Sequence, residues 1–266
     1  MADRYAVIGN PVGHSKSPRI HALFAAQTAQ DIRYEAVLAP LDGFAATVAE
    51  FAVAGGRGAN VTVPFKEEAF RLADRLSVRA QAAGAINTLS FGLEGIVGDN
   101  TDGAGLVRDL AANLDFAIAG CRVLVLGAGG AARGVISPLL SERPASLTLA
   151  NRDADKAKRL AAAFSGCTGG GFAAIEGQKF DLIVNATSTG LSGEELPLPL
   201  GVFASHGLAY EMVYGRDTPF LRQARAAGVA VADGLGMLVE QAAEAFFIWR
   251  RIRPDTAPVL AALRQE

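Results

Sequence analysis

The segment Gly13–Pro18 carries two hydroxyl groups at a spacing that suits an anionic ligand. Ser15 and Ser17 lie two residues apart, directly before an expected helix. Hydroxyls in this position can bind a carboxylate, because the amino-terminal end of a helix is positive and favours negative charge. The alternative is that Ser17 only caps the helix.

A second segment, Asn60–Lys66, combines an amide, a hydroxyl and an amine. Asn60 and Thr62 share one face of an expected strand because side chains alternate along a strand. Lys66 follows at the start of a helix, where its charge opposes the positive helix end. A carboxylate and a ligand oxygen nearby would offset that repulsion. The alternative is an ordinary solvated lysine.

Asn87 and Asp102 are expected where two further strands end. Asn87 could merely begin a turn, and Asp102 could merely cap a helix that starts near Gly103. Together with the two segments above, they supply amides, hydroxyls, one ammonium and one carboxylate. This is the set of groups needed to bind a polyhydroxylated acid.

A glycine-rich turn follows the apolar strand expected at Arg122–Leu126. In the pattern Gly-x-Gly-x-x-Ala, Gly127 permits a tight turn, Gly129 lets the backbone approach a pyrophosphate, and Ala132 keeps the next helix close to its strand. Free N–H groups at the helix start would bind the phosphates. The alternative is a plain loop, but a strand before it and a helix after it favour a dinucleotide site. The turn consists of Gly127, Ala128, Gly129, Gly130 and Ala131.

The end of the next strand favours NADP over NAD. NAD sites usually place an acid there to bind the ribose hydroxyls, whereas this chain has Asn151 and Arg152. A guanidinium can stack on adenine and bind a 2′-phosphate with two hydrogen bonds. Lys156 adds positive charge. Asp153 is an acid beside the proposed phosphate, and capping of the following helix explains its presence.

Alternating strands and helices predict an α/β fold. The first half should contain strands and helices at Tyr5–Ile8, Pro18–Thr28, Tyr34–Leu38, Leu41–Val53, Gly58–Val63 and Lys66–Leu72, then a hairpin from Ala85–Phe91 and Gly95–Gly98. The second half should be a Rossmann-type domain with elements at Arg122–Leu126, Ala131–Leu140, Ser146–Ala150, Asp153–Phe164 and Phe180–Val184.

The predicted domain organisation is discontinuous. We expect a substrate-binding domain over residues 1–103 and 236–266, and a dinucleotide-binding domain over 104–235, with a linking helix around Gly103–Asn113. The long apolar-rich helix Leu235–Arg251 should pack back on the first domain.

Composition sets the broad class. A chain of 266 residues suits two domains, and a net charge of −2 gives no field that would attract nucleic acid or an anionic membrane surface. Cys121 and Cys167 form no CxxC motif, and the sequence shows no signal peptide, so we expect a reduced cytoplasmic protein. No apolar run is long enough to cross a membrane. The three histidines are scattered, so we expect no metal site.

The motifs together resemble the shikimate dehydrogenase family over nearly the whole chain. The resemblance rests on seven blocks in order: 9–18, 60–66, 84–88, 100–103, 127–131, Asn185-Ala186-Thr187-Ser188, and 233–242. It implies NADPH-dependent, reversible reduction of 3-dehydroshikimate to shikimate, a CH–OH oxidoreductase step in chorismate and aromatic amino-acid biosynthesis. The expected partners are small molecules, and the expected assembly is a monomer or homodimer.

The resemblance also implies an active site in the cleft between the two domains, and it implies residue roles. Lys66 and Asp102 would be the catalytic pair. The implied substrate residues are Ser15, Ser17, Thr62, Lys66, Asn87, Asp102, Tyr214 and Gln241. The implied cofactor residues, besides the glycine-rich turn, are Asn151, Arg152, Lys156, Thr187, Ser188, Met212, Gly234 and Met237.

Some positions depart from the family, and two rival functions follow. Many relatives carry threonine at Asp153 and arginine at Lys156, and an aspartate is commoner at Glu211. One rival is an NAD-using quinate/shikimate dehydrogenase, although Ser17 disfavours it because quinate-acting relatives often carry threonine there. The other is a non-catalytic NADP-binding sensor, which the presence of both Lys66 and Asp102 disfavours.

Overall fold

The computed structural model describes residues 2–266, which divide into two compact units. The first unit comprises the chain up to Gly105 together with Leu238–Glu266, and the second comprises Leu106–Met237. The two connections run through α5 (Asp102–Arg108) and α10 (Leu235–Arg250). The sequence predicted boundaries at 103/104 and 235/236, each two residues from these divisions.

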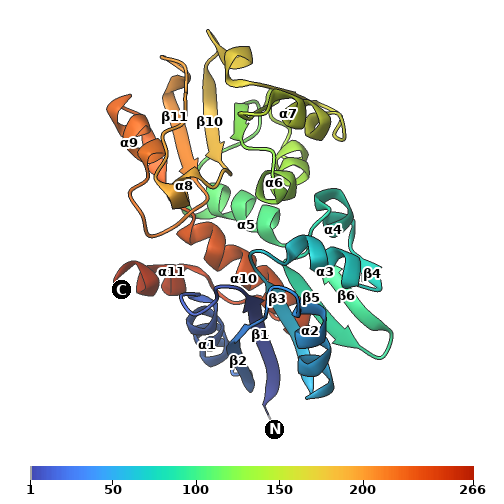
Figure 1. Cartoon of the computed structure of the whole chain (residues 1–266). Helices are drawn as coiled ribbons and strands as arrows, with labels where there is room; N and C mark the ends of the chain where they lie inside the picture. Colours follow the sequence, from blue (N-terminus) through green and yellow to red (C-terminus); the bar gives the residue numbers. More distant parts are fainter. Residues whose placement is uncertain (1) are drawn as a thin grey trace. The chain divides into compact units, whose positions relative to one another are not determined.

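The first unit is built on a mixed sheet with strand order β2-β1-β3-β5-β6-β4 (Figure 1). β1 pairs in parallel with β2 and β3, whereas β5 is antiparallel to both β3 and β6. The strands are β1 (Asp3–Gly9), β2 (Ile32–Leu38), β3 (Gly56–Val61), β4 (Arg75–Leu76), β5 (Thr88–Gly92) and β6 (Gly95–Asp99). The remaining helices are α1 (Ser17–Thr28), α2 (Phe44–Val53), α3 (Lys66–Leu72), α4 (Val78–Ala83) and α11 (Ala257–Arg264).

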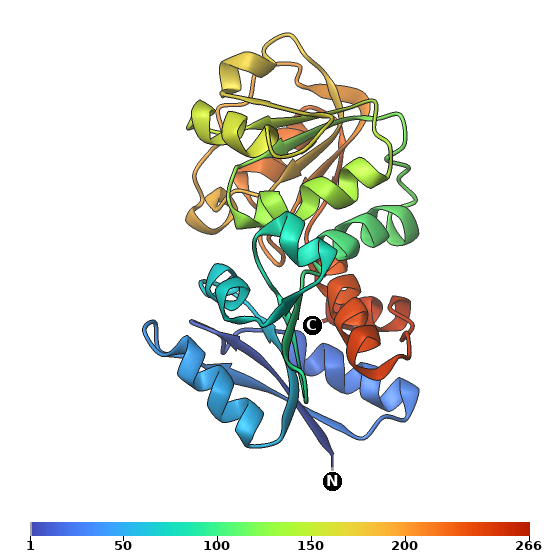
Figure 2. The same cartoon turned by 90° about the vertical axis from the view of Figure 1, so that its right-hand side faces the viewer.

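Alternation along β1 gives this sheet two buried faces. Ala6 and Ile8 lie in one apolar core with Phe44 and Phe51 of α2. On the opposite face Tyr5 stacks on Trp249 of α10. Figure 2 shows α2 on one side of the sheet and α1 with α10 on the other. Because helices cover both faces, the sheet positions segments from distant parts of the sequence at its strand ends.

The second unit has an entirely parallel sheet in the order β12-β11-β10-β7-β8-β9. This is the strand order of a doubly wound dinucleotide-binding fold, whose ligand crevice lies where the order reverses, between β7 and β10. Its strands are β7 (Arg122–Leu126), β8 (Ser146–Ala150), β9 (Cys167–Gly170), β10 (Phe180–Asn185), β11 (Phe203–Glu211) and β12 (Ala230–Ala232). Its helices are the π-helix η1 (Asp109–Asn113), α6 (Gly130–Ser141), α7 (Ala154–Ala161), the 3-10 helix η2 (Phe172–Ile175), α8 (Thr189–Ser192) and α9 (Pro219–Ala226).

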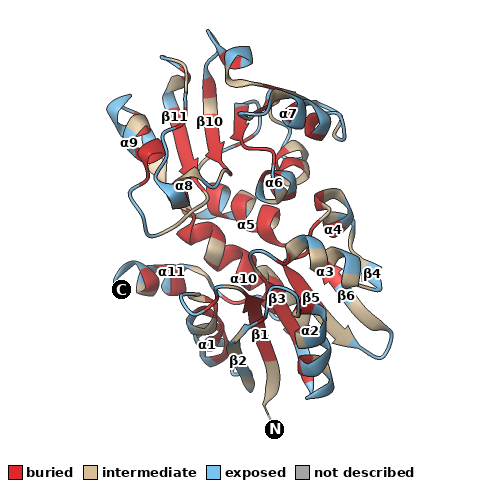
Figure 3. Cartoon of the chain, viewed as in Figure 1, coloured by how far each residue is buried: buried red, intermediate tan, exposed pale blue. Residues whose placement is uncertain are grey.

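The central strands of this sheet are buried on both faces. Val123 and Val125 of β7 belong to one core, whereas Leu124 and Leu126 belong to the core on the opposite face. Figure 3 shows β10 and β11 buried over most of their length. Such continuous apolar runs are typical of parallel strands covered by helices.

The expected α/β fold with a Rossmann-type domain is confirmed, and several element boundaries are corrected. Ser17 is not the cap of α1: it is the first helical residue, and Lys16 holds the cap position without a side-chain bond. The strand predicted to reach Val63 ends at Val61, because Thr62–Phe65 forms a turn in which the Phe65 N–H donates to the Thr62 carbonyl at 3.1 Å. Asn87 precedes β5 rather than ending a strand.

Candidate active site

Lys66 and Asp102 form the centre of a polar cluster in the first unit. The Lys66 Nζ lies 2.5 Å from Asp102 Oδ2, and the two side chains are 29% and 11% exposed. Lys66 is the first residue of α3, and Asp102 is the first residue of α5. The carboxylate thus offsets the unfavourable placement of an ammonium at a helix start. The structure brings together the two residues for which the sequence predicted a catalytic pairing.

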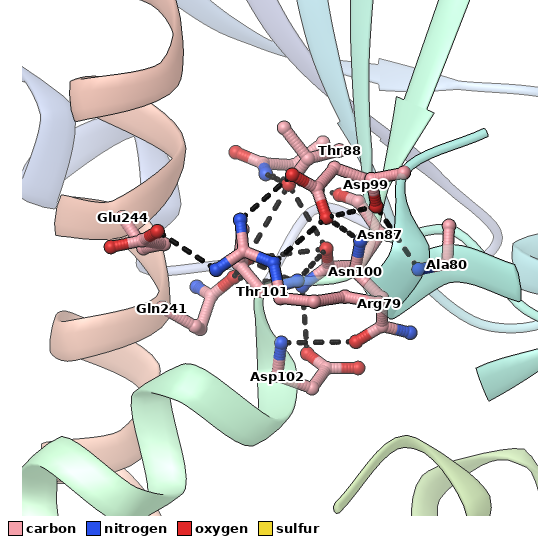
Figure 4. Close-up of polar contacts among 12 residues, drawn as sticks. Arg79, Ala80, Asn87, Thr88, Asp99, Asn100, Thr101, Asp102, Gln241 and Glu244 are labelled. Carbon is pink, nitrogen blue, oxygen red and sulfur yellow. Dashed lines mark hydrogen bonds and ion pairs between the residues drawn. The ribbon is translucent and has the colours of Figure 1, made fainter. Parts of the chain in front are cut away.

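Asn87 connects this pair to two other segments (Figure 4). Its Nδ2 lies 2.8 Å from Asp102 Oδ1 and 3.2 Å from Gln241 Oε1. Its Oδ1 accepts the Thr101 backbone N–H at 2.8 Å. Asn87 is 2% exposed, so these bonds fix its amide orientation. Asp102 and Gln241, which are far apart in sequence, are therefore held against a single amide.

Backbone bonds hold the same segments in register. The Ile86 N–H donates to the Lys66 carbonyl at 2.9 Å, and the Asn87 N–H donates to the Asp99 carbonyl at 3.1 Å. The start of α3, the approach to β5 and the end of β6 are thus joined directly. These backbone hydrogen bonds position the side chains of the cluster.

Ser15, Ser17 and Thr62 occupy the turns after β1 and β3. Ser15 is partly buried and its Oγ accepts the Ser17 N–H at 3.2 Å, whereas Ser17 is buried in the first turn of α1. Thr62 donates its N–H to the Ile8 carbonyl at 3.0 Å, which carries the β1–β3 pairing one residue past the strand. Both turns therefore follow the carboxyl ends of adjacent parallel strands.

Asn60, which the sequence placed on one face with Thr62, has a structural role in the same unit. The Tyr34 hydroxyl donates to Asn60 Oδ1 at 2.7 Å, and Asn60 Nδ2 donates to the Asn87 carbonyl at 3.1 Å. Burial raises the pKa of Tyr34 well above its ordinary value. Tyr34 thus supports Asn87 indirectly, through Asn60. The sequence did not reveal this pair of hydrogen bonds.

The glycine-rich turn of the second unit has the backbone that the motif predicts. Gly127 has a φ of 109°, and a Cβ there would lie 3.1 Å from the Ala186 carbonyl oxygen. A Cβ on Gly129 or Gly130 would meet no atom within 4 Å, so the chain leaves open space beside them. Ala132 is fully buried. The start of α6 therefore fits the close approach of a dinucleotide phosphate.

The turn after β8 and the first turn of α7 carry two cations and an acid that caps the helix. Arg152 and Lys156 are exposed, and within residues 2–266 neither side chain has a hydrogen bond or ion pair. Asp153 accepts the Lys156 N–H at 3.0 Å, which confirms that it caps α7. Asn151 Nδ2 donates to the Asp153 carbonyl at 3.0 Å. The acid is engaged by the helix, and the cations are available to an anionic group.

The remaining expected cofactor residues lie at the carboxyl ends of β10, β11 and β12. Thr187 Oγ1 donates to Asn185 Oδ1 at 2.7 Å, and Ser188 is exposed at the start of α8. Position 234 also requires glycine for packing, because a Cβ there would lie 2.1 Å from the Met212 carbonyl oxygen. Met237 is buried in the core of this unit, and Tyr214 is partly buried after β11.

Glu211 organises this end of the second unit, a role that the sequence did not reveal. The side chain is fully buried and accepts bonds from Asn185 Nδ2 at 2.7 Å, Thr218 Oγ1 at 3.0 Å and the Val213 N–H at 3.2 Å. Burial raises the pKa of the Glu211 carboxyl, and these donors only partly oppose that shift. Because Asn185 also holds Thr187, Glu211 joins the loops after β10 and β11.

Residues 2–266 contain neither a cluster of metal-binding side chains nor a membrane-spanning helix. No three His, Cys, Asp or Glu side chains are grouped as metal ligands. No helix in that part of the chain has the length and hydropathy required to cross a membrane.

Comparison with known proteins identifies the family. Residues 7–89 match the shikimate dehydrogenase substrate-binding domain, residues 109–190 match shikimate/quinate 5-dehydrogenase, and residues 234–264 match the shikimate 5′-dehydrogenase C-terminal domain. The shikimate dehydrogenase (NADP(+)) of Dechloromonas aromatica is 65% identical, with 99% of this chain and 98% of that protein covered.

Solved structures agree over the same length. An Ael1 enzyme from Pseudomonas putida superposes with a TM-score of 0.93 at 50% identity, covering 98% of both chains. Shikimate 5-dehydrogenase from Thermus thermophilus, solved in complex with NADP(H) and shikimate, superposes with a TM-score of 0.89 at 36% identity, covering 99% of both chains. From these matches, together with the paired Lys66 and Asp102 and the doubly wound second unit, it follows that this chain belongs to the shikimate dehydrogenase family.

Proposed function

We propose that this chain is an NADP-dependent shikimate dehydrogenase, which reversibly reduces 3-dehydroshikimate to shikimate in chorismate and aromatic amino-acid biosynthesis. The observation that carries the proposal is the Lys66–Asp102 contact held by Asn87 beside Gln241. Full-length similarity to named shikimate dehydrogenases (NADP(+)) supports the reaction and the cofactor.

The polar cluster of the first unit suits a hydroxylated acid. Ser15 and Ser17, at the start of α1, would bind the substrate carboxylate, because the helix end favours negative charge. Thr62, Asn87 and Gln241 supply the donors and acceptors that ring hydroxyls require. Tyr214, which follows β11, is the remaining proposed substrate residue.

Lys66 and Asp102 would carry out the proton transfer that accompanies hydride transfer. Reduction of a ketone creates an alkoxide, which an ammonium can stabilise and protonate. Asp102 orients Lys66 at 2.5 Å and keeps a second carboxylate oxygen on the Asn87 amide.

The second unit fits NADP. The start of α6 would hold the pyrophosphate, with Arg152 and Lys156 at the 2′-phosphate and Asn151 beside them. Thr187, Ser188, Met212, Gly234 and Met237 would lie along the rest of the cofactor. When bound, NADPH supplies the hydride.

The decisive experiment follows nicotinamide absorbance with purified protein. We expect turnover with shikimate and NADP, and far less with quinate and NAD. Preference for quinate and NAD would instead identify the quinate-acting rival. Binding of NADP without turnover of either acid would identify a non-catalytic sensor.

The proposal also covers the partners with their assembly state and the cellular location. The partners are small molecules, and we propose a monomer or homodimer, to be measured by sedimentation. We also propose a cytoplasmic location, which is supported by two cysteines, Cys121 and Cys167, that remain free thiols. Fractionation of cells that express a tagged chain would test the location.

A further inference from the structure

A partly buried ion cluster lies beside the proposed catalytic residues in the first unit (Figure 4). Arg79 of α4 binds Asp99 with two hydrogen bonds, from Nε to Oδ1 at 3.0 Å and from Nη2 to Oδ2 at 2.7 Å. The remaining Nη1 binds Glu244 Oε1 of α10 at 2.8 Å. Both acid side chains are only 16% exposed. One guanidinium therefore bridges the end of β6 and a turn of α10.

The β6 side of this bridge leads to Asp102 in two hydrogen-bonded steps. Asp99 Oδ1 accepts the Asn100 N–H at 2.7 Å, and Asn100 Oδ1 accepts the Asp102 N–H at 3.1 Å. Asn100 Nδ2 is anchored on the Ala85 carbonyl at 3.0 Å. The turn that carries Asp102 into α5 is thus fixed at both ends, with Arg79 at the outer end.

The α10 side of the bridge leads to Gln241. Glu244 follows Gln241 by three residues on α10, so the two side chains share one face of the helix. Gln241 Oε1 contacts Asn87 Nδ2 at 3.2 Å. Holding Glu244 therefore fixes the rotation and height of the helical turn that presents Gln241.

The charges in the cluster balance. Asp99 and Glu244 face Arg79, and Arg253 adds a second cation at 2.5 Å from Glu244 Oε2. Burial alone would raise the pKa of Asp99 and of Glu244, but the arginine hydrogen bonds hold both pKa values below their ordinary range. Loss of Arg79 would leave Asp99 with no cation and would separate the two segments.

We infer that Arg79 is a positioning residue, which sets the placement of Asp102 and Gln241 around Asn87 by joining Asp99 to Glu244. Its importance for turnover rests on the proposed function, whereas its hold on the two segments does not. A displacement of a reacting group by about 1 Å can lower turnover about 100-fold. Arg79 thereby influences the reaction without contacting the reacting atoms.

The test compares Arg79→Ala with Arg253→Ala in the full chain. Both changes remove one cation from Glu244, but only the first also removes the cation from Asp99. We expect Arg79→Ala to lower kcat for shikimate oxidation about 10- to 100-fold, and Arg253→Ala to change it by less than about twofold. The NADP dissociation constant should stay within about twofold in both, because the proposed cofactor residues belong to the second unit.

Two further readouts separate positioning from a general loss of structure. In a double-mutant cycle, Arg79→Ala should add less to the loss caused by Asp102→Asn than it causes alone, because Asp102 is one of the two residues that Arg79 positions. Hydrogen exchange should rise in the backbone of 99–105 and 238–245 in Arg79→Ala but not in Arg253→Ala. If Arg79→Ala does not fold, Asp99→Asn replaces it, with the same exchange pattern and at least about a tenfold loss of kcat expected.

Equal kcat and equal exchange in the Arg79→Ala and Arg253→Ala variants would overturn the inference, as would wild-type values in Asp99→Asn. If the unmodified protein does not oxidise shikimate with NADP, the proposed function fails. In that case the exchange pattern alone still decides whether Arg79 holds the two segments.

Discussion

At the scale of single residues, Lys66 is the group whose removal best separates chemistry from binding. Lys66→Ala should lower turnover about 10²- to 10⁴-fold and change shikimate affinity little, because the ammonium matters most as charge develops on oxygen. Steady-state kinetics together with calorimetric binding of shikimate would measure both quantities. The result would be contradicted by normal turnover with weak binding, which would make Lys66 an anchor and leave Tyr214 as the next proton donor to test.

His21 should make the stability of the first unit depend on pH. The ring is fully buried, stacks on Tyr34 at 4.0 Å between centroids, and has no hydrogen-bond partner for either nitrogen among residues 2–266. Burial lowers the pKa of His21 to about 3 from an ordinary 6.5, and an interaction with Asn60 opposes the shift only weakly. The folded state therefore disfavours the protonated ring.

The sign follows from proton linkage. Below pH 6.5 the unfolded chain binds a proton that folded His21 does not, so stability falls with acid until the pH nears 3. At pH 5 the loss is roughly 2 kcal/mol. His21→Phe keeps the ring and removes the titration. Denaturant unfolding at pH 7 and pH 5 should show a smaller loss for the variant, and equal losses would refute this role.

The sequence was sufficient to predict the candidate site residues within motifs, but not the residues that hold them in place. Lys66, Asn87 and Asp102 follow or precede strands at sequence positions that already restrict them to one region of the fold. Arg79 and Glu244 are separated by 165 positions, and no local pattern relates them. A single arginine in a short helix looks like a solvated surface residue until the fold brings α10 beside it.

At the scale of elements, the turn between β8 and α7 should decide the choice between NADP and NAD. Arg152 is exposed there without an ion pair among the described residues. Arg152→Ala should weaken use of NADP by about 1.5–3 kcal/mol, the cost of a charged hydrogen bond to phosphate, and leave NAD nearly unchanged. The Michaelis constants for the two cofactors measure the difference. Equal losses with both would show that Arg152 does not contact the 2′-phosphate.

Glu211 should give the second unit a pH dependence of opposite sign to that of His21. Its pKa is raised above 4.5 by burial, so the folded state favours the protonated carboxyl. The stability it contributes is complete below pH 4.5 and is lost as the pH rises through the raised pKa. The stability of Glu211→Gln relative to the unmodified chain should therefore increase between pH 4.5 and pH 8. A difference that does not vary with pH in chemical denaturation would contradict the buried carboxyl.

Elements with one strong signal were predicted closely, and those with competing signals were not. β7 and β8 match their predicted ranges because each is a short apolar run beside a turn. β3 ends two residues early because Pro64 lacks an N–H and the chain turns before it. β11, α9, β12 and α11 were not predicted individually: β12 has only three residues, and alanines in β11 and α11 mark no single period. α9 does carry a start signal, Thr218 before Pro219, but it is only eight residues long.

At the scale of the whole molecule, the order of the chain makes the second unit better able than the first to fold by itself. The second unit, Leu106–Met237, is continuous and contains both of its apolar cores. The first unit is interrupted, and α10 and α11 return to it from the carboxyl end. Phe246 is fully buried there, and Trp249 stacks on Tyr5. The first unit therefore lacks part of its core until the whole chain is present.

This asymmetry predicts different behaviour for two fragments. A fragment of residues 106–237 should fold and bind NADP, because its cores and its proposed cofactor residues are all present. A fragment of residues 1–105 should remain largely unfolded, since exposing apolar surface at about 25 cal/mol per Å² removes much of the small net stability of a domain. Circular dichroism and NADP titration of each fragment are the measurements. Adding a peptide of residues 235–266 should restore structure to the 1–105 fragment, because α10 supplies its missing aromatic core. A 1–105 fragment that folds cooperatively by itself would show that α10 is not needed for that core.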